Sequence, residues 1–179
     1  DYSITKKIRG ISDAQLKNML SQQLQEDRIR FDNYLGAHSE MLRLILSQKR
    51  FHDYVFDKKG YEEPVTRVKI HYEIPHWLPD APVMRRIVHF HYAILMDGKD
   101  KVREIYQGWP EPLPRSLHEP PNRLIQLSLN QSFLTYIDSV PFLLTSESVK
   151  DRMGKTMATL MLIARLNDDF LISSLRLTR

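Results

Sequence analysis

A stripe of mostly apolar residues within positions 12–57 constrains this chain more than any other feature. Its members recur at spacings of mostly three, four or seven residues, which is the period of one helix face. They are Leu16, Leu20, Leu24, Phe31, Leu35, His38, Leu42 and Ile45. Ser12 followed by Asp13 is a suitable N-cap, and no proline occurs before Pro64. The pattern predicts one helix of roughly 40 residues, about 60 Å long and longer than the ~30 Å of a small domain.

The two halves of this predicted helix differ in character. From Met41 to Ile45 the stripe broadens, which indicates that the second half packs on the body of the domain. The first half is narrower and flanked by polar residues, as in a seam between two helices. We therefore expect parallel homodimer pairing of the N-terminal helices. The residues of this seam are Leu16, Leu20, Leu24 and Phe31.

Prolines divide the rest of the chain. Nine of the ten prolines fall between positions 64 and 121, and they mark two irregular segments, which we name the first crossing (58–86) and the second crossing (108–121). A short strand fits within Val65–Glu73 of the first crossing. Both crossings carry aromatic residues, which either plug the domain or line a ligand pocket.

Two β-hairpins are predicted from strand propensity and turn chemistry. The first spans 87–107 and turns at Asp97-Gly98-Lys99-Asp100. The second pairs Phe142–Val149 with Thr156–Leu166 across a turn at 150–155. Both contain a run of apolar residues long enough for a buried strand.

The remaining segments complete an α+β fold. Residues 124–137 fit a strand or a short helix equally well. Asn167-Asp168-Asp169 caps a final helix over Phe170–Leu177. We expect a long N-terminal helix packed on an antiparallel sheet, followed by a short C-terminal exit helix. The predicted units are a signalling helix (1–57), a sensor body (58–167) and the exit helix (168–179).

Alternation along the first predicted strand separates two faces. One is wholly apolar, and we expect it to pack against the long helix. The opposite face carries two imidazoles, which would then face the crossings. The apolar face consists of Val88, Phe90, Tyr92, Ile94 and Met96, and the opposite face of Ile87, His89, His91, Ala93 and Leu95.

Composition excludes several classes of function. Residues 1–60 hold 11 basic and 8 acidic groups and the remainder 15 and 14, with no basic stripe, so a nucleic-acid partner is not expected. The chain has no cysteine, which excludes disulfides, thiolate catalysis and Cys-ligated zinc. No phosphate-binding loop, HExxH motif or Ser-His-Asp order is present. We expect no enzymatic turnover and no cofactor.

The pattern His89-x-His91 is the sharpest chemical feature. Alternate residues on a strand share a face, so the two imidazoles could bind one metal ion. A cupin-type metal site would need a carboxylate four or five residues later, where this chain has Leu95 and Met96. Hydrogen-bonded histidines within a sheet are the simpler interpretation. A small metal-binding or enzymatic domain that uses this pair is kept as an alternative.

The C-terminal third resembles the closing hairpin of Cache-type sensor domains. The resemblance rests on the strand 140–149, on Asp151 and Gly154 of the turn, and on the strand and Asn-Asp-Asp-Phe-Leu segment of 158–171. The strand and turn of 92–99 are similar to the middle hairpin of that family. Ala158 and Ala164 replace glycines that are usual beside the last strand. The arginine-aromatic signature of amino-acid-binding members is missing, so amino-acid binding does not follow from the resemblance.

The resemblance implies a PAS-like domain outside the cytoplasm, in the periplasm, between two transmembrane helices. Such domains belong to histidine kinases, chemoreceptors or diguanylate cyclases, bind a small molecule and signal through their terminal helices. The start at Asp1, the long first helix and the final helix at the end of the chain agree with this expectation. A cytosolic dimerisation module built on the long helix is a further alternative.

The predicted ligand site lies on the histidine-bearing face of the sheet, beneath the crossings. Tyr106 and the Thr145/Ser146 region would join it from neighbouring strands, and two residues would reach in from the first crossing. A concave site with a few convergent polar groups is typical of small-molecule binding. The predicted ligand-binding residues are His89, His91, Tyr106, Trp77, Arg86, Thr145 and Ser146.

Overall fold

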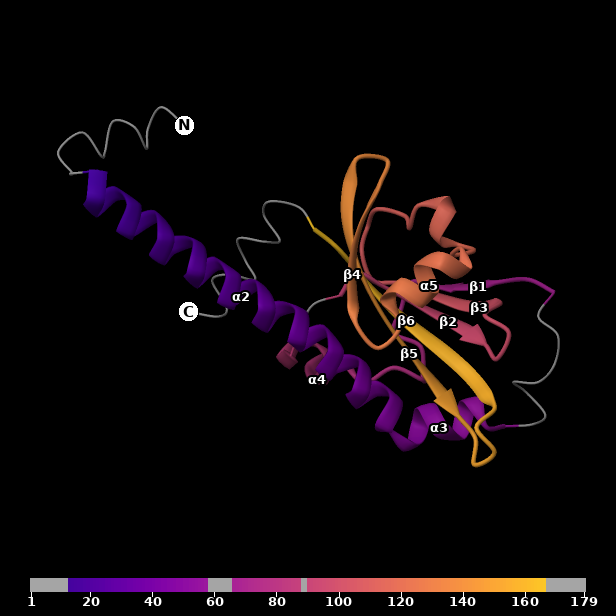
Figure 1. Cartoon of the computed structure of the whole chain (residues 1–179). Helices are drawn as coiled ribbons and strands as arrows, with labels where there is room; N and C mark the ends of the chain where they lie inside the picture. The colour runs from indigo at the N-terminus through magenta and orange to yellow at the C-terminus, as the bar shows by residue number, and fades with distance from the viewer. Residues whose placement is uncertain (1–12, 58–65, 88–89, 167–179) are drawn as a thin grey trace.

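The computed structural model describes residues 13–57, 66–87 and 90–166 and confirms the predicted α+β class. A long helix, α2 (Asp13–Ser47), lies across a six-stranded sheet (Figure 1). The N-terminal part of α2 projects well beyond the sheet, as its predicted length requires. Within the described ranges, no helix has the length and apolar character needed to cross a membrane.

The long helix ends earlier than predicted. Gln48 adopts an extended conformation (φ −75°, ψ 141°), and a separate helix, α3 (Lys49–Val55), follows it. The Ser47 hydroxyl donates to the carbonyl oxygen of Leu44 at 2.9 Å, a local bond that competes with helix continuation. The prediction of one continuous helix is therefore wrong at Gln48. The break turns Phe51 into the core, where it is fully buried.

The sheet is mixed rather than purely antiparallel. Its strand order is β1-β3-β2-β6-β5-β4, and β1 runs parallel to β3 while all other pairs are antiparallel. The parallel edge strand corrects the predicted antiparallel sheet, and it lies within the segment where a short strand was expected. The strands are β1 (Lys69–His71), β2 (Tyr92–Asp97), β3 (Val102–Gln107), β4 (Ser132–Ile137), β5 (Val140–Lys150) and β6 (Thr156–Arg165).

Both predicted hairpins form, and each turn is organised by one aspartate. Asp97 Oδ1 accepts hydrogen bonds from the backbone N–H groups of Lys99 and Lys101. Asp151 Oδ1 accepts in the same way from those of Met153 and Lys155. Such bonds between a side chain and nearby backbone specify a turn directly from the local sequence. The two hairpins adjoin through β2 and β6 at the centre of the sheet.

The segment that fitted either a strand or a helix contains both. Helix α5 (Asn122–Ser128) is followed by Asn130, whose φ of 59° reverses the chain into β4. The first crossing likewise contains a short helix, α4 (Ala81–Ile87), with Pro82 at its second position, where the missing N–H is tolerated. Ile87 is therefore helical, and the first strand of the hairpin begins at Tyr92 rather than at position 87.

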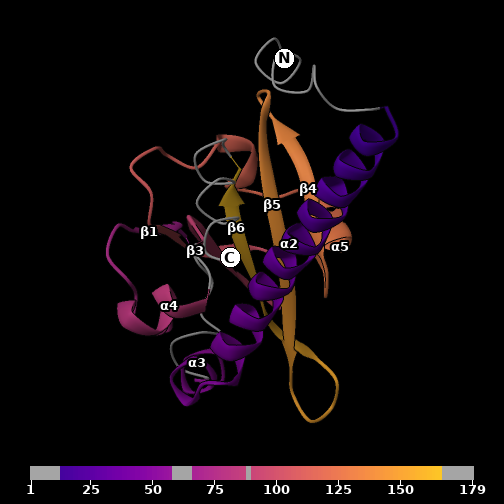
Figure 2. The same ribbon diagram turned by 90° about the vertical axis from the view of Figure 1, so that its left-hand side faces the viewer.

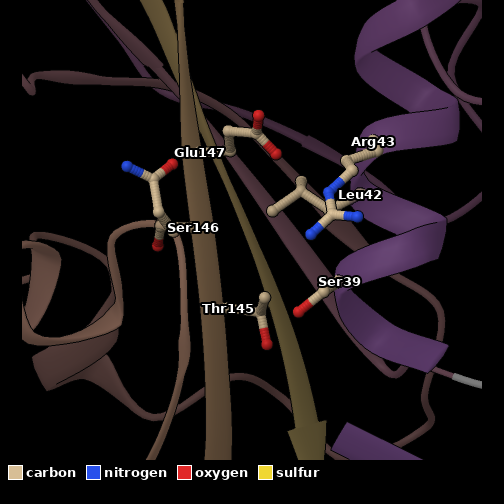
Figure 3. Close-up of a pocket in the computed structure, with 7 residues that line it drawn as sticks. Ser39, Leu42, Arg43, Thr145, Ser146 and Glu147 are labelled. Carbon is tan, nitrogen blue, oxygen red and sulfur yellow. The ribbon is translucent and has the colours of Figure 1, made fainter. Parts of the chain in front are cut away.

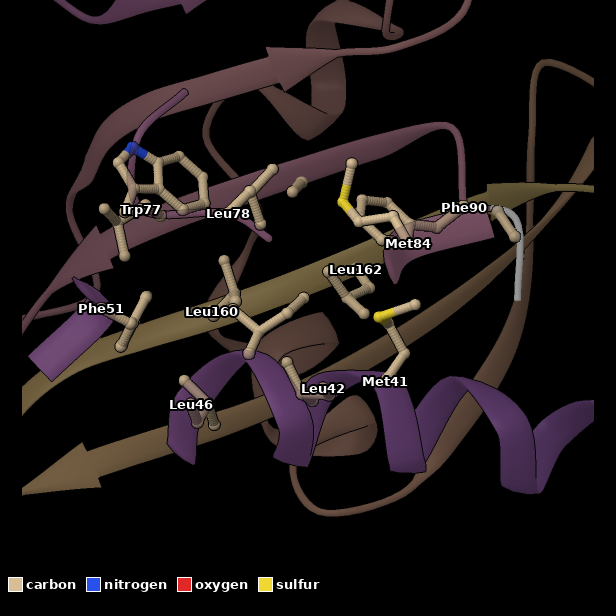
Figure 4. Packing of buried hydrophobic residues seen from close by; sticks show 14 of the residues in the cluster. Met41, Leu42, Leu46, Phe51, Trp77, Leu78, Met84, Phe90, Leu160 and Leu162 are labelled. Carbon is tan, nitrogen blue, oxygen red and sulfur yellow. The ribbon is translucent and has the colours of Figure 1, made fainter. Parts of the chain in front are cut away.

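The two faces of the sheet carry separate cores. On one face α2, α3, α4 and the loop at Trp77 enclose a first core cluster, shown in Figure 4, that includes Met41, Leu42, Leu160 and Leu162. On the opposite face the second crossing and α5 cover a second core cluster. Members of the second cluster from these covering segments are Leu113, Leu117 and Ile125.

The alternation along β2 is as predicted, but the assignment of its faces is wrong. Ala93 and Leu95 belong to the first core cluster, against α2. Tyr92, Ile94 and Met96 belong to the second, beneath the second crossing. Phe90 does pack in the first cluster, although it precedes the strand, and Val88 lies outside the described residues. The predicted C-terminal exit helix also lies outside them.

Candidate functional site

A small polar hollow lies between helix α2 and strand β5, and we name it the α2–β5 hollow (Figure 3). Its volume is about 110 Å³. A polar cavity of this size holds several water molecules or a ligand of a few heavy atoms. Its lining residues are Ser39, Leu42, Arg43, Asn130, Thr145, Ser146 and Glu147.

Helix α2 contributes one wall. Ser39 and Arg43 are separated by four residues, so they lie on the same side of the helix, one turn apart. Leu42, next to them, is 1% exposed and anchors this turn in the first core cluster. The polar wall therefore follows directly from the edge of the apolar stripe, where polar residues flank the buried ones.

Strand β5 contributes the opposite wall. Register pairs Thr145 with Leu162 and Glu147 with Leu160, and both leucines belong to the first core cluster. Thr145 and Glu147 consequently share the sheet face that meets α2, and Figure 3 shows both across from Arg43 and Ser39. On this face β6 is apolar, whereas β5 has the polar residues Thr145 and Glu147 between Leu143 and Val149 of the same core cluster, and the hollow lies at these two polar positions.

The hollow remains open because β4 ends its pairing with β5 at Thr145. The last register pair is Ser132 with Thr145, and Asn130 takes the place of a further strand residue. The Asn130 N–H donates to the Ser146 carbonyl oxygen at 2.7 Å. A tight turn thus replaces a strand beside residues 146–147 and leaves room at the sheet edge.

The hydroxyl groups of β5 are held by other hydroxyls. Thr145 Oγ1 and Ser132 Oγ are 2.9 Å apart, and Ser146 Oγ and Ser128 Oγ are 2.8 Å apart. Neither β5 hydroxyl is hydrogen-bonded to an imidazole or carboxylate that could act as its general base. The Thr145 hydroxyl is thereby held in a fixed orientation at the wall of the hollow.

The hollow contains one positive and one negative side chain. Arg43 on α2 and Glu147 on β5 form no ion pair or side-chain hydrogen bond with another residue in the described part of the chain. Arg43 is exposed and Glu147 is partly buried. The lining therefore offers one cationic and one anionic group, together with hydroxyl and amide groups.

Two of the seven predicted site residues, Thr145 and Ser146, line this hollow. The Thr145 side chain lies on the face that meets α2, whereas the Ser146 hydroxyl is bonded to Ser128 on the opposite face of the sheet. Trp77 is fully buried in the first core cluster, where its ring lies 6.5 Å from that of Phe51. It fills the core instead of lining a pocket. Tyr106 packs at the edge of the same cluster, with its ring 6.4 Å from that of Phe90.

His91 is buried and held in place by backbone. Its Nδ1 accepts a hydrogen bond from the Arg165 N–H at 2.7 Å, and its ring lies edge-on to Trp109 at 4.5 Å. The predicted residue His89 and the side chain of Arg86 lie outside the described part of the chain. Among the residues that are described, no group of three or more histidine, aspartate or glutamate side chains could hold a metal ion.

A second histidine, His38 of α2, is buried near His91. His38 is 1% exposed, its ring lies edge-on to Tyr34 at 4.6 Å, and its Nε2 has no hydrogen-bond partner among the described residues. Burial, and to a smaller extent the charge of His91, lower the pKa of His38 to about 3. His38 therefore holds α2 against the sheet as a neutral imidazole.

A second polar cluster joins α3 to the edge of the sheet. Buried Glu104 accepts hydrogen bonds from the Tyr54 hydroxyl and from His71 Nε2, the latter at 2.6 Å. Burial, followed by the bond to Glu104, raises the pKa of Tyr54. The phenol therefore remains a hydrogen-bond donor. The cluster ties together α3, β3 and β1.

An open hollow of about 670 Å³ borders Tyr54. Its charged groups are largely satisfied by one another: Arg50 pairs with Asp80 at 3.2 Å, and Asp53 pairs with Lys49 at 2.9 Å. The lining is acidic overall, with Asp53, Asp57 and Asp80 beside Arg50, so it does not offer one balanced pair of opposite charges as the α2–β5 hollow does.

Sequence reasoning did not single out Ser39, Arg43, Asn130 or Glu147. One signal pointed toward the first two, because the broadening of the stripe at 41–45 placed this part of the helix on the body. No local pattern indicated which strand residues would face them.

No protein-family model, curated protein or solved structure matches this chain.

Proposed function

We propose that this chain is an extracytoplasmic ligand-sensing domain of a membrane receptor of the histidine kinase, chemoreceptor or diguanylate cyclase type. It binds a small molecule without turnover and passes a conformational signal through its terminal helices. The observation that carries this proposal is that the α2–β5 hollow is walled by the long helix itself. A ligand bound there contacts both the sheet and the element that leaves the domain.

The coupling has a simple physical basis. A ligand shifts a conformational equilibrium only as far as it binds one state better than the other. Because Ser39 and Arg43 move with α2 while Thr145 and Glu147 stay on the sheet, ligand contacts across the hollow depend on the position of the helix. A helix transmits such a displacement along its length, and α2 projects away from the sheet.

The layout of the elements supports the resemblance to Cache-type domains. A long helix precedes the body, and the middle and closing hairpins adjoin at the centre of one sheet (Figures 1 and 2). Asp151 and Gly154, which belong to the resemblance, lie in the turn between β5 and β6, where Gly154 has a φ of 82°. The periplasmic location and the flanking transmembrane helices belong to the proposal on the same grounds.

Signal output is proposed to pass through a parallel homodimer of α2. The pairing residues are Leu16, Leu20 and Leu24, whose side chains lie outside what the structure describes. Phe31, included in the predicted seam, packs partly buried against the first core cluster and so contributes to the body. Sedimentation at increasing protein concentration tests the pairing: we expect weak self-association that Leu20→Asp abolishes. A strict monomer at millimolar concentration would contradict it.

The metal-binding or enzymatic alternative has less support. Nδ1 of His91 already accepts the Arg165 N–H and is not available as a metal ligand. The hydroxyls of the hollow have other hydroxyls as partners rather than a base.

A thermal-shift screen of a metabolite library tests the sensing function. We expect at least one compound to raise the melting temperature and, in hydrogen exchange, to slow exchange in 36–47 of α2 and 143–149 of β5. Thr145→Val, which keeps the side-chain shape but removes the hydroxyl, should weaken this response. Thr135→Val on the neighbouring strand is the control. Protection confined to other segments would overturn the placement of the site.

A further inference from the structure

We propose that the α2–β5 hollow selects a small zwitterion, with Arg43 binding its anionic end and Glu147 its cationic end. This inference rests on the proposed function, since it names the ligand class of that same site. It is drawn from the charges of the hollow.

Charge balance in the hollow favours a ligand with opposite charges at its two ends. Arg43 and Glu147 line one hollow from two elements, and each lacks an ion-pair partner among the described residues. A ligand with one charge satisfies one of them and places its uncharged end beside the other. A ligand with opposite charges at its two ends satisfies both and leaves the lining neutral. Charge-assisted hydrogen bonds are stronger than neutral ones, so the second ligand gains at both ends.

The hydrogen-bonding groups of the lining also match the two ends of a zwitterion. An arginine guanidinium binds a carboxylate or sulfonate through two parallel hydrogen bonds, and a glutamate carboxylate accepts hydrogen bonds from an ammonium group. Ser39 and Asn130 add a hydroxyl and an amide to the lining of the same hollow. The volume of about 110 Å³ suits a ligand with a few heavy atoms between its charges. Short amino-carboxylates and amino-sulfonates have this form.

A zwitterion would also link the helix to the sheet. Arg43 belongs to α2 and Glu147 to β5, so only a ligand charged at both ends forms an ionic contact with the helix and the sheet at once. Such a ligand fixes the position of α2 relative to β5, whereas a singly charged ligand holds one wall alone. The zwitterion is therefore the class that can report the position of the helix.

Matched probes test this selection. Titration calorimetry on the whole chain would compare the zwitterions glycine, β-alanine and taurine with propionate, which has only the anionic end, and with propylammonium, which has only the cationic end. We expect one zwitterion to bind at least about tenfold more tightly than either singly charged probe. If no zwitterion binds at millimolar concentration, or if propionate or propylammonium binds equally well, the inference is overturned.

Two variants assign the ends. Arg43→Gln should bring zwitterion affinity down to that of propylammonium, and Glu147→Gln should bring it down to that of propionate. Arg43→Lys keeps the charge without the paired geometry and should retain part of the affinity. Arg28→Gln on the exposed side of α2 and Glu40→Gln near the hollow are the controls, and both should bind as the wild type does. Unchanged zwitterion affinity in both hollow variants would overturn the assignment.

The outcome separates this inference from the proposed function. If the metabolite screen yields an uncharged or singly charged ligand that protects α2 and β5 while all zwitterions fail, the ligand class is wrong and the sensing function stands. If neither the screen nor the zwitterions give binding, both fail.

Discussion

Helix α2 meets the sheet along two adjoining strips of different chemistry. Over β6 it packs Met41 and Leu42 against Leu160 and Leu162, which are almost fully buried (Figure 4). Over β5, one strand away, the register partners of these leucines are Glu147 and Thr145, which line a hollow. We name these the apolar strip and the polar strip. The apolar strip holds the helix on the domain, and the polar strip leaves its fine position open to a ligand.

The two strips differ in how much folding free energy is lost when one of their side chains is removed. Removing a buried apolar side chain loses its transfer free energy and leaves a cavity. Removing an exposed, unpaired charge loses little, because water solvates that group already. A helix held on one side and adjustable on the other is suited to small movements without unfolding. Substitutions on the two strips test this contrast, and Tyr54 in the buried polar cluster of Glu104 gives an intermediate case between them.

Leu160→Ala on the apolar strip should lower the free energy of unfolding by about 2–5 kcal/mol, as truncation of a buried leucine does. Leu160 is fully buried in the first core cluster. Urea denaturation measures the effect. The same substitution at Leu134, which is 43% exposed on edge strand β4, is the control and should cost under about 1 kcal/mol. Equal losses at the two positions would mean that the apolar strip does not hold the helix.

Acidification should destabilise the packing of α2 on the sheet through His38, which lies one helical turn before Leu42 of the apolar strip. Burial lowers the pKa of His38 in the folded chain to about 3 from the usual 6.5, so between these values only the unfolded chain binds the proton. Stability attributable to this group therefore falls as the pH drops below 6.5, by up to about 1.4 kcal/mol per pH unit. Between pH 6.5 and pH 5 the loss should reach roughly 2 kcal/mol.

Denaturation of the wild type and of His38→Leu at several pH values isolates this contribution. Between pH 6.5 and pH 5 the His38→Leu variant should lose less stability than the wild type. Both proteins contain the same carboxylates, but only the wild type has the buried imidazole. Parallel pH profiles of the two proteins would show that the His38 imidazole is protonated as readily in the folded chain as in the unfolded chain, which would contradict this prediction.

Tyr54→Phe probes the buried cluster at the end of α3. It removes one of the two hydrogen bonds that the Glu104 carboxylate accepts and leaves His71 as the other partner. We expect a loss of about 1–2 kcal/mol in the free energy of unfolding. Tyr136→Phe, on a tyrosine that is 69% exposed, should be nearly neutral by the same measurement. A neutral Tyr54→Phe would indicate that water or another donor replaces the phenol.

Arg43→Gln on the polar strip should change the free energy of unfolding by less than about 0.5 kcal/mol without ligand, because Arg43 is exposed and unpaired among the described residues. Thermal denaturation checks this value, with Arg28→Gln as the control. A large loss would mean that Arg43 forms a structural ion pair, and the distinction between the two strips would then disappear.

Local patterns predicted much of the fold. The periodic stripe gave the long helix, and the aspartates at 97 and 151 gave the two hairpin turns. The residues that share a face of β2 were also predictable, because alternation is a property of any extended chain. Less of the candidate site was predictable: Thr145 and Ser146 were named, while the two charges of the hollow were not.

What these patterns left open is how distant elements meet. Both faces of β2 are apolar, so alternation could not say which face meets α2, and the packing placed Ala93 and Leu95 there. The break at Gln48 follows no proline or glycine and accompanies the docking of Phe51 in the core. Helical period, turn bonding and alternation depend on residues a few positions apart, and the sequence alone determines them. The placement of Arg43 and Glu147 around one hollow depends on how a helix packs across a sheet, and only the tertiary structure decides that.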